Sequence, residues 1–263
     1  MNLAGRTVLV TGGSGGLGAA AARALAARGA AVIVSGRREA ELEGVAAEIG
    51  GRAVVADLAA KDGPAKLAEA AGDVDVLVAN AALPGSGALD DYDAASIDRV
   101  LDVNLRAPIL LTRLLAPGMA ARGGGHLVFI SSLSGKAAGP RSSLYSATKF
   151  GLRGFALALR QDLEEENVGV SLVSPGFVRG AGMFADSGGK LPFGVGTATP
   201  DQVAAAVVRA IEHGKAEVDV APLGLRAGTK VAMVAPVFAA AAQKRLGSME
   251  VARSIEAGQR EKR

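Results

Sequence analysis

The stretch Val8-Leu9-Val10-Thr11-Gly12-Gly13-Ser14-Gly15-Gly16-Leu17-Gly18 decides the fold that this sequence predicts. Apolar residues run up to Val10, a glycine-rich turn follows at once, and a helical pattern opens at Leu17. Glycines let a backbone approach an anion closely, and a helix start offers unpaired N–H groups and the positive end of its dipole. An ordinary loop between a strand and a helix can look the same. However, a second strand at Ala31–Ser35 completes a βαβ unit of the size that dinucleotide-binding folds use.

Strand-like and helical patterns alternate along the rest of the chain, which is typical of a doubly wound parallel sheet. We predict an α/β fold of the Rossmann type, a seven-stranded parallel sheet with helices on both faces. The predicted strands are Thr7–Val10, Ala31–Ser35, Arg52–Ala56, Val74–Val78, His126–Ser131, Gly169–Val173 and Glu217–Ala221. Gly50-Gly51 is expected to end one helix, and Thr199-Pro200-Asp201-Gln202 to begin another with a capping box. We assign residues 1–222 to a nucleotide-binding catalytic domain and residues 223–263 to a C-terminal helical extension of it.

The composition narrows the classes of function. The 263 residues are 49% apolar, which suits one large domain with a sizeable core. A net charge of +3 without interleaved basic and aromatic residues argues against a nucleic-acid partner. The chain contains no Cys, so we predict no disulfide, no metal site and a cytoplasmic location. We identify no signal peptide, and no apolar run approaches the roughly 20 residues that cross a bilayer.

The end of the second predicted strand indicates which nicotinamide cofactor is used. A carboxylate there would bind the ribose hydroxyls of NAD, but the chain has Gly36, followed by Arg37 and Arg38. A guanidinium group binds a 2′-phosphate well, so we favour NADPH or NADP+ over NADH or NAD+. The two arginines could instead open a solvated helix. Asp57, after the third strand, could bind adenine or merely cap the next helix.

A second cluster of residues predicts proton-transfer chemistry. Tyr145 and Lys149 are four residues apart, so on a helix they share one face. A nearby cation favours a phenolate, and Lys149 together with an oxidised nicotinamide could lower the Tyr145 pKa by roughly three units from its usual value of about 10. Such a phenol can donate a proton to a developing alkoxide or accept one in reverse. Ser132 follows an apolar strand and would lie at the carboxyl edge of the sheet, where ligands bind.

Together these motifs resemble those of the short-chain dehydrogenase/reductase family, in its compact single-domain branch, over about residues 4–222. Thr11-Gly12-x-x-x-Gly16-x-Gly18 resembles its cofactor turn, Asn80-Ala81-Ala82 its Asn-Ala-Gly motif, and Pro175-Gly176 the turn beside the nicotinamide. Asn104, Ser132, Tyr145 and Lys149 match its catalytic tetrad.

The resemblance implies a role for each of these residues. Tyr145 would be the acid/base, Ser132 would orient the substrate carbonyl, Lys149 would hold the nicotinamide ribose, and Asn104 would position a water in a proton relay. It also implies a homotetramer or homodimer built partly on the helices that carry Asn104 and Tyr145. The predicted cofactor-binding residues are Thr11, Gly12, Ser14, Gly15, Gly16, Leu17, Gly18, Arg37, Arg38, Asp57, Leu58, Asn80, Ala81, Ala82, Tyr145, Lys149, Pro175, Gly176 and Val178.

The chain departs from the family pattern at two positions. Gly180 stands where the family often has a Thr that contacts the nicotinamide carboxamide, and Ala82 replaces a Gly near the adenosine side. We expect both changes to be tolerated.

Two segments bear on the substrate. The turn-rich segment 180–200 carries Met183, Phe184, Leu191, Pro192 and Phe193, which suggests a lid and an apolar aliphatic or ring-bearing carbonyl substrate. The same residues could simply anchor the loop.

Residues 223–263 are apolar at first, with basic residues at the margins. We favour a helix packed on its own domain or on a neighbouring subunit, and the alternative is contact with a membrane surface.

The function that we predict is NADPH-dependent reduction of a carbonyl, such as a 3-oxoacyl compound, a steroid-like ketone or another ketone, or oxidation of a secondary alcohol in reverse. One alternative is an NAD-dependent alcohol or hydroxysteroid dehydrogenase. Another is a nucleotide-sensing protein without turnover, although such a protein would be expected to lose Tyr145 or Lys149.

Overall fold

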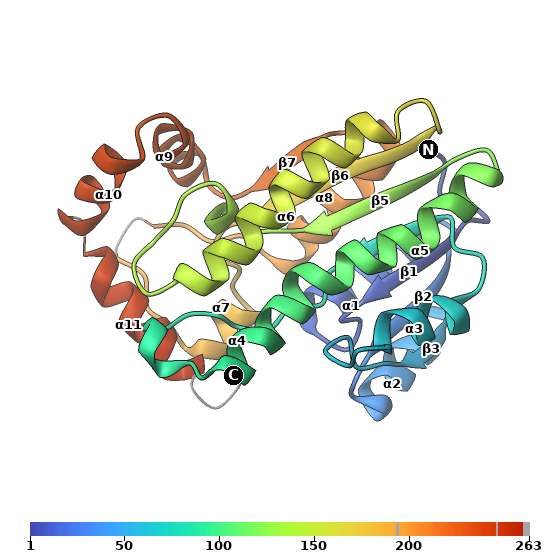
Figure 1. Cartoon of the computed structure of the whole chain (residues 1–263), viewed down its shortest axis with the longest axis horizontal. Helices are drawn as coiled ribbons and strands as arrows, with labels where there is room; N and C mark the ends of the chain where they lie inside the picture. The colour runs from blue at the N-terminus through green and yellow to red at the C-terminus, as the bar shows by residue number, and fades with distance from the viewer. Residues whose placement is uncertain (193–194, 246, 260–263) are drawn as a thin grey trace.

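The fold is built on one parallel seven-stranded sheet, as the sequence predicts (Figure 1). The computed structural model describes residues 1–192, 195–245 and 247–259. The strand order β3-β2-β1-β4-β5-β6-β7 places β1 and β4 at the centre. Because all neighbouring strands are parallel, their carboxyl ends meet at one edge. Ligands of doubly wound sheets bind at that edge.

The strands agree closely with the sequence prediction. They are β1 (Thr7–Thr11), β2 (Ala31–Gly36), β3 (Arg52–Val55), β4 (Val76–Ala79), β5 (Gly125–Ile130), β6 (Val168–Pro175) and β7 (Glu217–Val220). The largest differences are a later start for β4 and a longer β6. β6 is longer because it pairs with both β5 and β7, and its pairing with β7 extends to Pro175.

Helices connect the strands and continue beyond the last one. They are α1 (Gly16–Ala26), α2 (Glu39–Ile49), α3 (Gly63–Ala71), α4 (Ala94–Leu101), α5 (Ala107–Ala121), α6 (Ser143–Asp162), α7 (Met183–Ser187), α8 (Pro200–His213), α9 (Leu223–Val234), α10 (Pro236–Arg245) and α11 (Ser248–Gln259). Short turns of other helix types are η1 (Leu89–Asp91), η2 (Asp102–Arg106) and η3 (Leu133–Gly135).

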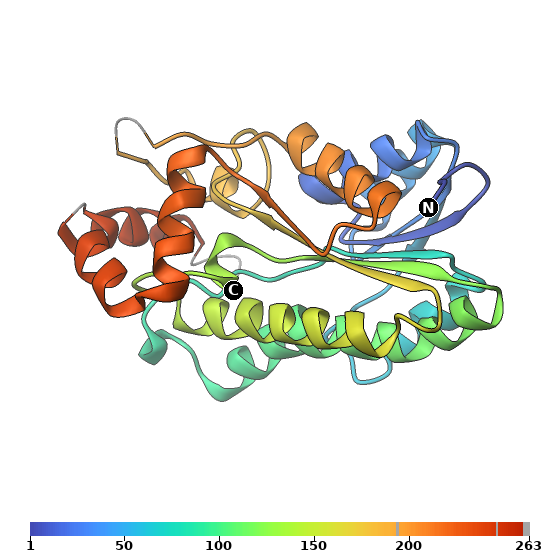
Figure 2. The same cartoon turned by 90° about the horizontal axis from the view of Figure 1, so that it is seen from above.

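The sheet is covered on both faces (Figure 2). One core joins apolar residues of β1 and β2 to α1, α2 and α8, for example Leu25, Leu42 and Val207. The other joins Leu77 and Phe129 to α3, α5 and α6. Both cores consist mainly of Val, Leu and Ala, which suits strands that are buried on both sides.

Both predicted helix signals are confirmed. Thr199 Oγ1 accepts a hydrogen bond from Gln202 N at 3.2 Å, and Gln202 Oε1 accepts one from Thr199 N at 2.9 Å, so the capping box at α8 is complete. Gly50 ends α2 in the left-handed conformation.

The segment after β7 forms α9, α10 and α11, which lie together at the carboxyl end of the sheet (Figures 1 and 2). α11 packs against α7, and α10 packs against α9. Within the described residues, no helix combines the length and the apolar character that crossing a bilayer requires. The division of the chain at residue 222 stays a prediction.

Candidate active site

The glycine-rich turn between β1 and α1 requires glycine at two positions in particular. Gly12 has a φ of +66°, and a Cβ there would lie 2.9 Å from Ala81 Cα. A Cβ at Gly18 would lie 2.1 Å from the carbonyl oxygen of Gly12. Side chains at these positions would push the turn away from β4 and from the start of α1. The backbone therefore stays close enough to cradle an anion at the helix N-terminus.

Thr11 and Asn80 fasten this turn to the end of β4. Thr11 Oγ1 accepts hydrogen bonds from the backbone N–H groups of Asn80 and Ala81, both at 3.1 Å. Asn80 Nδ2 donates to the Thr11 carbonyl oxygen at 2.9 Å. Thr11 is buried and lines neither of the cavities described below. Its position supports the turn rather than direct contact with a ligand.

A cavity of about 280 Å³ lies along the turn and holds most of the predicted cofactor residues. Its lining includes Gly12, Ser14, Gly15, Gly16, Leu17, Gly18, Arg37, Arg38, Asp57, Leu58, Asn80, Ala81 and Ala82.

At one end of this cavity, Arg38 bends back over the turn. Its Nη2 donates to the Ser14 carbonyl oxygen at 2.8 Å, and its Nη1 lies 3.2 Å from Glu41 Oε1. Gly36 keeps the space beside Ser14 clear, because a Cβ there would lie 3.3 Å from Ser14 Oγ. The glycines thus keep open a space that larger side chains would fill, and exposed guanidinium groups line it. This arrangement fits a dinucleotide that carries a 2′-phosphate.

Asp57 does not cap the following helix, contrary to one of the two interpretations of the sequence. Its Oδ1 accepts a hydrogen bond from Ala59 N at 3.1 Å within a turn, and α3 begins later, after Asp62. Aspartate commonly bonds its own backbone two residues on, which explains the turn. Asp57 therefore remains at the cavity wall, where it can face a ligand.

A second cavity, of about 450 Å³, adjoins the first and is mostly apolar. The predicted residues that line it are Leu17, Asn80, Ala82, Ser132, Tyr145, Lys149, Pro175, Gly176 and Val178. Leu17, Asn80 and Ala82 line both cavities, so the two form a continuous cleft. The structure thus brings three members of the predicted tetrad into one cavity.

Tyr145 and Lys149 share a face of α6, as their spacing predicts. The Lys149 ammonium lies 5.6 Å from the centre of the Tyr145 ring and donates to the Ile130 carbonyl oxygen at 2.9 Å. Burial lowers the pKa of Lys149 to about 8, because it disfavours the charged ammonium.

Burial also raises the pKa of Tyr145 to about 12, and a hydrogen bond with the Ser132 side chain partly offsets this rise. The sequence predicts that Lys149 together with an oxidised nicotinamide lowers this pKa, and that combined effect stays a prediction. Among the effects that the chain alone exerts on Tyr145, burial is the largest, and the Lys149 ammonium lies over the ring. The phenol is therefore held in its neutral, proton-donating form around neutral pH.

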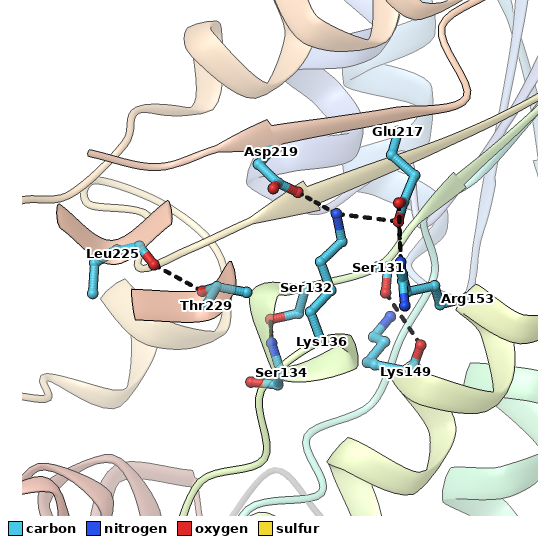
Figure 3. Close-up of polar contacts among 10 residues, drawn as sticks. All are labelled: Ser131, Ser132, Ser134, Lys136, Lys149, Arg153, Glu217, Asp219, Leu225 and Thr229. Carbon is cyan, nitrogen blue, oxygen red and sulfur yellow. Dashed lines mark hydrogen bonds and ion pairs between the residues drawn. The ribbon is translucent and has the colours of Figure 1, made fainter. Parts of the chain in front are cut away.

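Near Ser132, a partly buried network of ions around the buried Lys136 joins three elements (Figure 3). Lys136 Nζ lies 2.7 Å from Asp219 Oδ1 and 3.1 Å from Glu217 Oε1. Glu217 also pairs with Arg153 of α6 at 2.7 Å, and this hydrogen bond is the main reason that the Glu217 pKa lies below its usual value. The network ties the loop after β5 to β7 and to the helix that carries Tyr145 and Lys149.

Asn104 lies in neither cavity. It is buried in η2, a π-helical turn between α4 and α5, a kind of turn often found at functional sites. Its Oδ1 accepts from Leu83 N at 2.7 Å, and its Nδ2 donates to the Leu83 carbonyl oxygen at 2.9 Å. Its side chain thus holds the loop after β4, and its part in a proton relay stays a prediction.

The two departures from the family pattern lie in open or tolerant surroundings. Gly180 has a φ of +83° with no atom within 4 Å of a Cβ built there, and Ala82 lies at the junction of the two cavities. The neighbouring Ala181 packs against the glycine-rich turn. A Cβ built at Gly16 would lie 2.2 Å from the Cβ of Ala181. Ala181 and Gly182 thus form part of the wall of the cleft.

Sequence reasoning missed the contribution of the C-terminal segment to the second cavity. Val251, Ala252, Ile255 and Gln259 of α11 line it, together with Leu225 and Thr229 of α9 and Gln243 of α10. Arg141, which precedes α6, holds α11 through two hydrogen bonds to Glu256. The helical spacing of Val251, Ala252 and Ile255 signals a buried face, but spacing alone does not say which surface that face covers.

Further residues line the two cavities, and closure of the segment 180–200 as a lid stays a prediction. Met183, Phe184, Leu191 and Pro192 line the second cavity, whereas Phe193 lies outside the described residues. Arg99 lines the first cavity, and no sequence pattern singled it out.

Comparison with known proteins adds an independent line of evidence. Residues 6–190 match the model of the family described as short chain dehydrogenase. Ketoacyl reductase HetN of Nostoc sp. (strain PCC 7120) is 38% identical over 225 residues, which cover 82% of this chain and 78% of that protein.

Two solved structures also resemble this chain. A metagenomic short-chain oxidoreductase in complex with NADP is 36% identical with a TM-score of 0.70, and the match covers 84% of this chain and 99% of that one. A short-chain dehydrogenase from Sphingobium yanoikuyae in complex with NADPH is 26% identical with a TM-score of 0.75, covering 81% and 87%.

Proposed function

This chain belongs to the short-chain dehydrogenase family of oxidoreductases, and on that premise we propose that it uses NADPH to reduce an apolar ketone to a secondary alcohol, with Tyr145 as the acid. The same site would run the oxidation in reverse. The observation that carries the proposal is the continuous cleft: the glycine turn lies at one end, and Ser132, Tyr145 and Lys149 lie in the adjoining apolar cavity.

Each of the cavity residues would have a separate role in the reduction. Bound NADPH would supply the hydride. Ser132 would bind the substrate carbonyl oxygen through its hydroxyl, and Tyr145 would donate its phenolic proton to the same oxygen. A pKa of about 12 suits this direction, because Tyr145 then carries its proton before the reaction begins. Lys149 would bind the nicotinamide ribose, and an oxidised nicotinamide would add the positive charge that favours the phenolate in the reverse direction.

The preference for NADPH rests on Arg37 and Arg38. Neither is buried, both line the first cavity, and Arg38 already lies against Ser14. Two of the structural relatives are described as complexes with NADPH or NADP, which supports the same choice.

The substrate class rests on the walls of the second cavity. The rings of Phe177 and Phe184 lie 5.0 Å apart at their centres, and both residues line this cavity. Leu191, Val195 and Ile255 add aliphatic surface. A 3-oxoacyl compound, a steroid-like ketone or another apolar ketone would bury against these walls, and the name of the Nostoc relative, a ketoacyl reductase, favours the first.

Assembly into a homodimer or homotetramer is part of the proposal. Leu114 of α5 is 42% exposed and Phe150 of α6 is 43% exposed, so each of these two helices presents a large apolar side chain to its surroundings. Pairing of α5 and α6 between copies would bury both. The cytoplasmic location stays a prediction.

The test is turnover by the purified protein with NADPH and with NADH across ketones, aldehydes, quinones, 3-oxoacyl thioesters and oxosteroids. We expect ketone-dependent oxidation of NADPH, with NADH much poorer. A preference for NADH would favour the NAD-dependent dehydrogenase. Tight binding of NADPH without turnover on any substrate would favour a nucleotide sensor. Failure to bind either nucleotide would contradict the proposal as a whole.

A further inference from the structure

Several large apolar side chains of the helices α9 and α10 are exposed to solvent. Val234 is 89% exposed, Val237 84% and Phe238 69%. The residues of the same two helices that are buried are small, namely Thr229, Ala232 and Ala239. A solvated helix keeps its large apolar residues inside, and an exposed cluster of this kind marks a contact surface.

The charged residues of α9 and α10 are all basic. Arg226, Lys230, Lys244 and Arg245 are all exposed. The sequence contains no Asp or Glu from Val220 to Met249. Elsewhere the chain mixes both signs, with a net charge of only +3. Apolar side chains surrounded by cations are the pattern by which helices rest on anionic bilayers.

The position of α9 and α10 in the fold agrees with contact with a bilayer. α9 and α10 project at one end of the molecule, beyond the carboxyl edge of the sheet (Figures 1 and 2). Leu225, Thr229 and Gln243 of the same helices line the apolar cavity that holds Tyr145. One face of the pair thus meets the surroundings while the other borders the candidate substrate site.

We propose that α9 and α10 form a docking surface for an anionic lipid bilayer, which the chain contacts without crossing it. We call the exposed residues Leu223, Arg226, Lys230, Val234, Val237 and Phe238 the docking face. A second copy of the chain is the weaker occupant. A two-fold interface here would place the cations of one copy against those of the other, with no acid in the segment to pair with them.

The first test is co-sedimentation of the full chain with vesicles. We expect pelleting with vesicles of phosphatidylglycerol and phosphatidylcholine, little pelleting with phosphatidylcholine alone, and loss of pelleting at high salt. Phe238→Glu should weaken binding about tenfold. Lys230→Gln should weaken it about fivefold, because each cation near an anionic surface contributes about 1 kcal/mol of attraction. Val55→Glu is the matched control, because Val55 is 51% exposed on β3 and should leave binding unchanged.

Three results would overturn the proposal. One is equal, negligible pelleting of the wild type and Phe238→Glu. Another is equal binding to both vesicle types. The third is a fall in molar mass on Phe238→Glu by light scattering, without wild-type pelleting, because that result would make the face an interface between copies. None of these measurements uses NADPH or turnover, so failure here is distinguishable from failure of the proposed reduction.

A second readout rests on the proposed function. Phe238→Glu should raise KM for a ketone that partitions into vesicles and leave KM unchanged for a water-soluble ketone. An equal change for both ketones would show an effect inside the cavity and would contradict docking as its cause.

Discussion

Arg38 is the residue on which cofactor choice can be tested most sharply. Arg38→Ala should raise KM for NADPH by about 10- to 100-fold, the value of one charge-assisted hydrogen bond of roughly 1.5–3 kcal/mol, and leave KM for NADH nearly unchanged. Arg38→Lys keeps the charge but not the planar fork, so it should give an intermediate value. Steady-state kinetics with both nucleotides measures the effect. An equal loss for both would show that Arg38 mainly supports the turn through Ser14.

His126 makes the fold sensitive to acid. It is buried on β5, its Nε2 lies 2.8 Å from Ser171 Oγ, and burial lowers its pKa from 6.5 to about 4. Between these values the unfolded chain binds the proton and the folded chain does not, so stability is intact above pH 6.5 and falls as the pH drops toward 4. The loss approaches about 3 kcal/mol for a shift of this size.

Urea unfolding across this pH range tests the effect, and His126→Asn should flatten the fall. His213, the other histidine of the chain, lies exposed at the end of α8 and is the matched control as His213→Asn. A fall with the same slope in His126→Asn would assign acid sensitivity to the carboxylates instead.

At the scale of single residues, the sequence predicts well which candidate side chains gather in the cleft and less well which contacts they make. Spacing alone puts Tyr145 and Lys149 on one face of a helix, and the structure agrees. The pKa values depend on burial and on where the ammonium points, which no spacing reveals. For the same reason the bonds of Asn104 to Leu83 could not be anticipated.

At the scale of elements, the network around Lys136 determines how the loop after β5 sits against α6. Lys136→Met would leave the Glu217 and Asp219 carboxylates without their shared cation, and the free energy of unfolding should fall by about 2–3 kcal/mol. Thermal and urea unfolding measure this change. Lys66→Met is the control, because Lys66 pairs with Asp62 on the surface and should change stability little. Similar effects for both variants would contradict a structural role for the network around Lys136.

The ion pair between Arg141 and Glu256 holds α11 over the second cavity. Glu256→Gln removes the charge that pairs with Arg141, so α11 should detach more often. We expect faster amide hydrogen exchange in residues 248–259 and a several-fold higher KM for bulky apolar ketones, with kcat for a small ketone unchanged. Arg141→Gln should give the same result from the other side. Unchanged exchange in both variants would show that packing against α7 alone holds the helix.

The elements before residue 222 could be predicted because local patterns determine them. Alternating apolar runs, the Gly50 helix end and the capping box at Thr199 each act within a few residues. α11 could not be placed, because its apolar spacing is compatible with packing on its own domain, on another subunit or on a membrane. The contact between Arg141 and Glu256 spans 115 residues, a separation that local patterns do not encode.

At the scale of the whole molecule, we assign the chemistry, the assembly and the membrane contact to three separate surfaces. The cleft at the carboxyl edge of the sheet holds the candidate chemistry, α5 and α6 expose Leu114 and Phe150, where we propose assembly, and the proposed docking face lies on α9 and α10. Because these surfaces lie on different elements, Phe150→Glu should reduce the molar mass without changing vesicle binding. Light scattering measures the mass. A monomeric wild type would contradict assembly.

We propose Tyr145 as the proton donor of this cleft, and the chain offers a matched control because it contains only two tyrosines. Tyr92 is buried near α4 and lines neither cavity, and its hydroxyl donates to the carbonyl oxygen of Ser86 at 2.9 Å. The measurement to make is ketone-dependent NADPH oxidation by the wild type, Tyr145→Phe and Tyr92→Phe. We expect that Tyr145→Phe loses at least about 100-fold in kcat while still binding NADPH, and that Tyr92→Phe keeps its activity. Undiminished turnover in Tyr145→Phe would contradict the proposal.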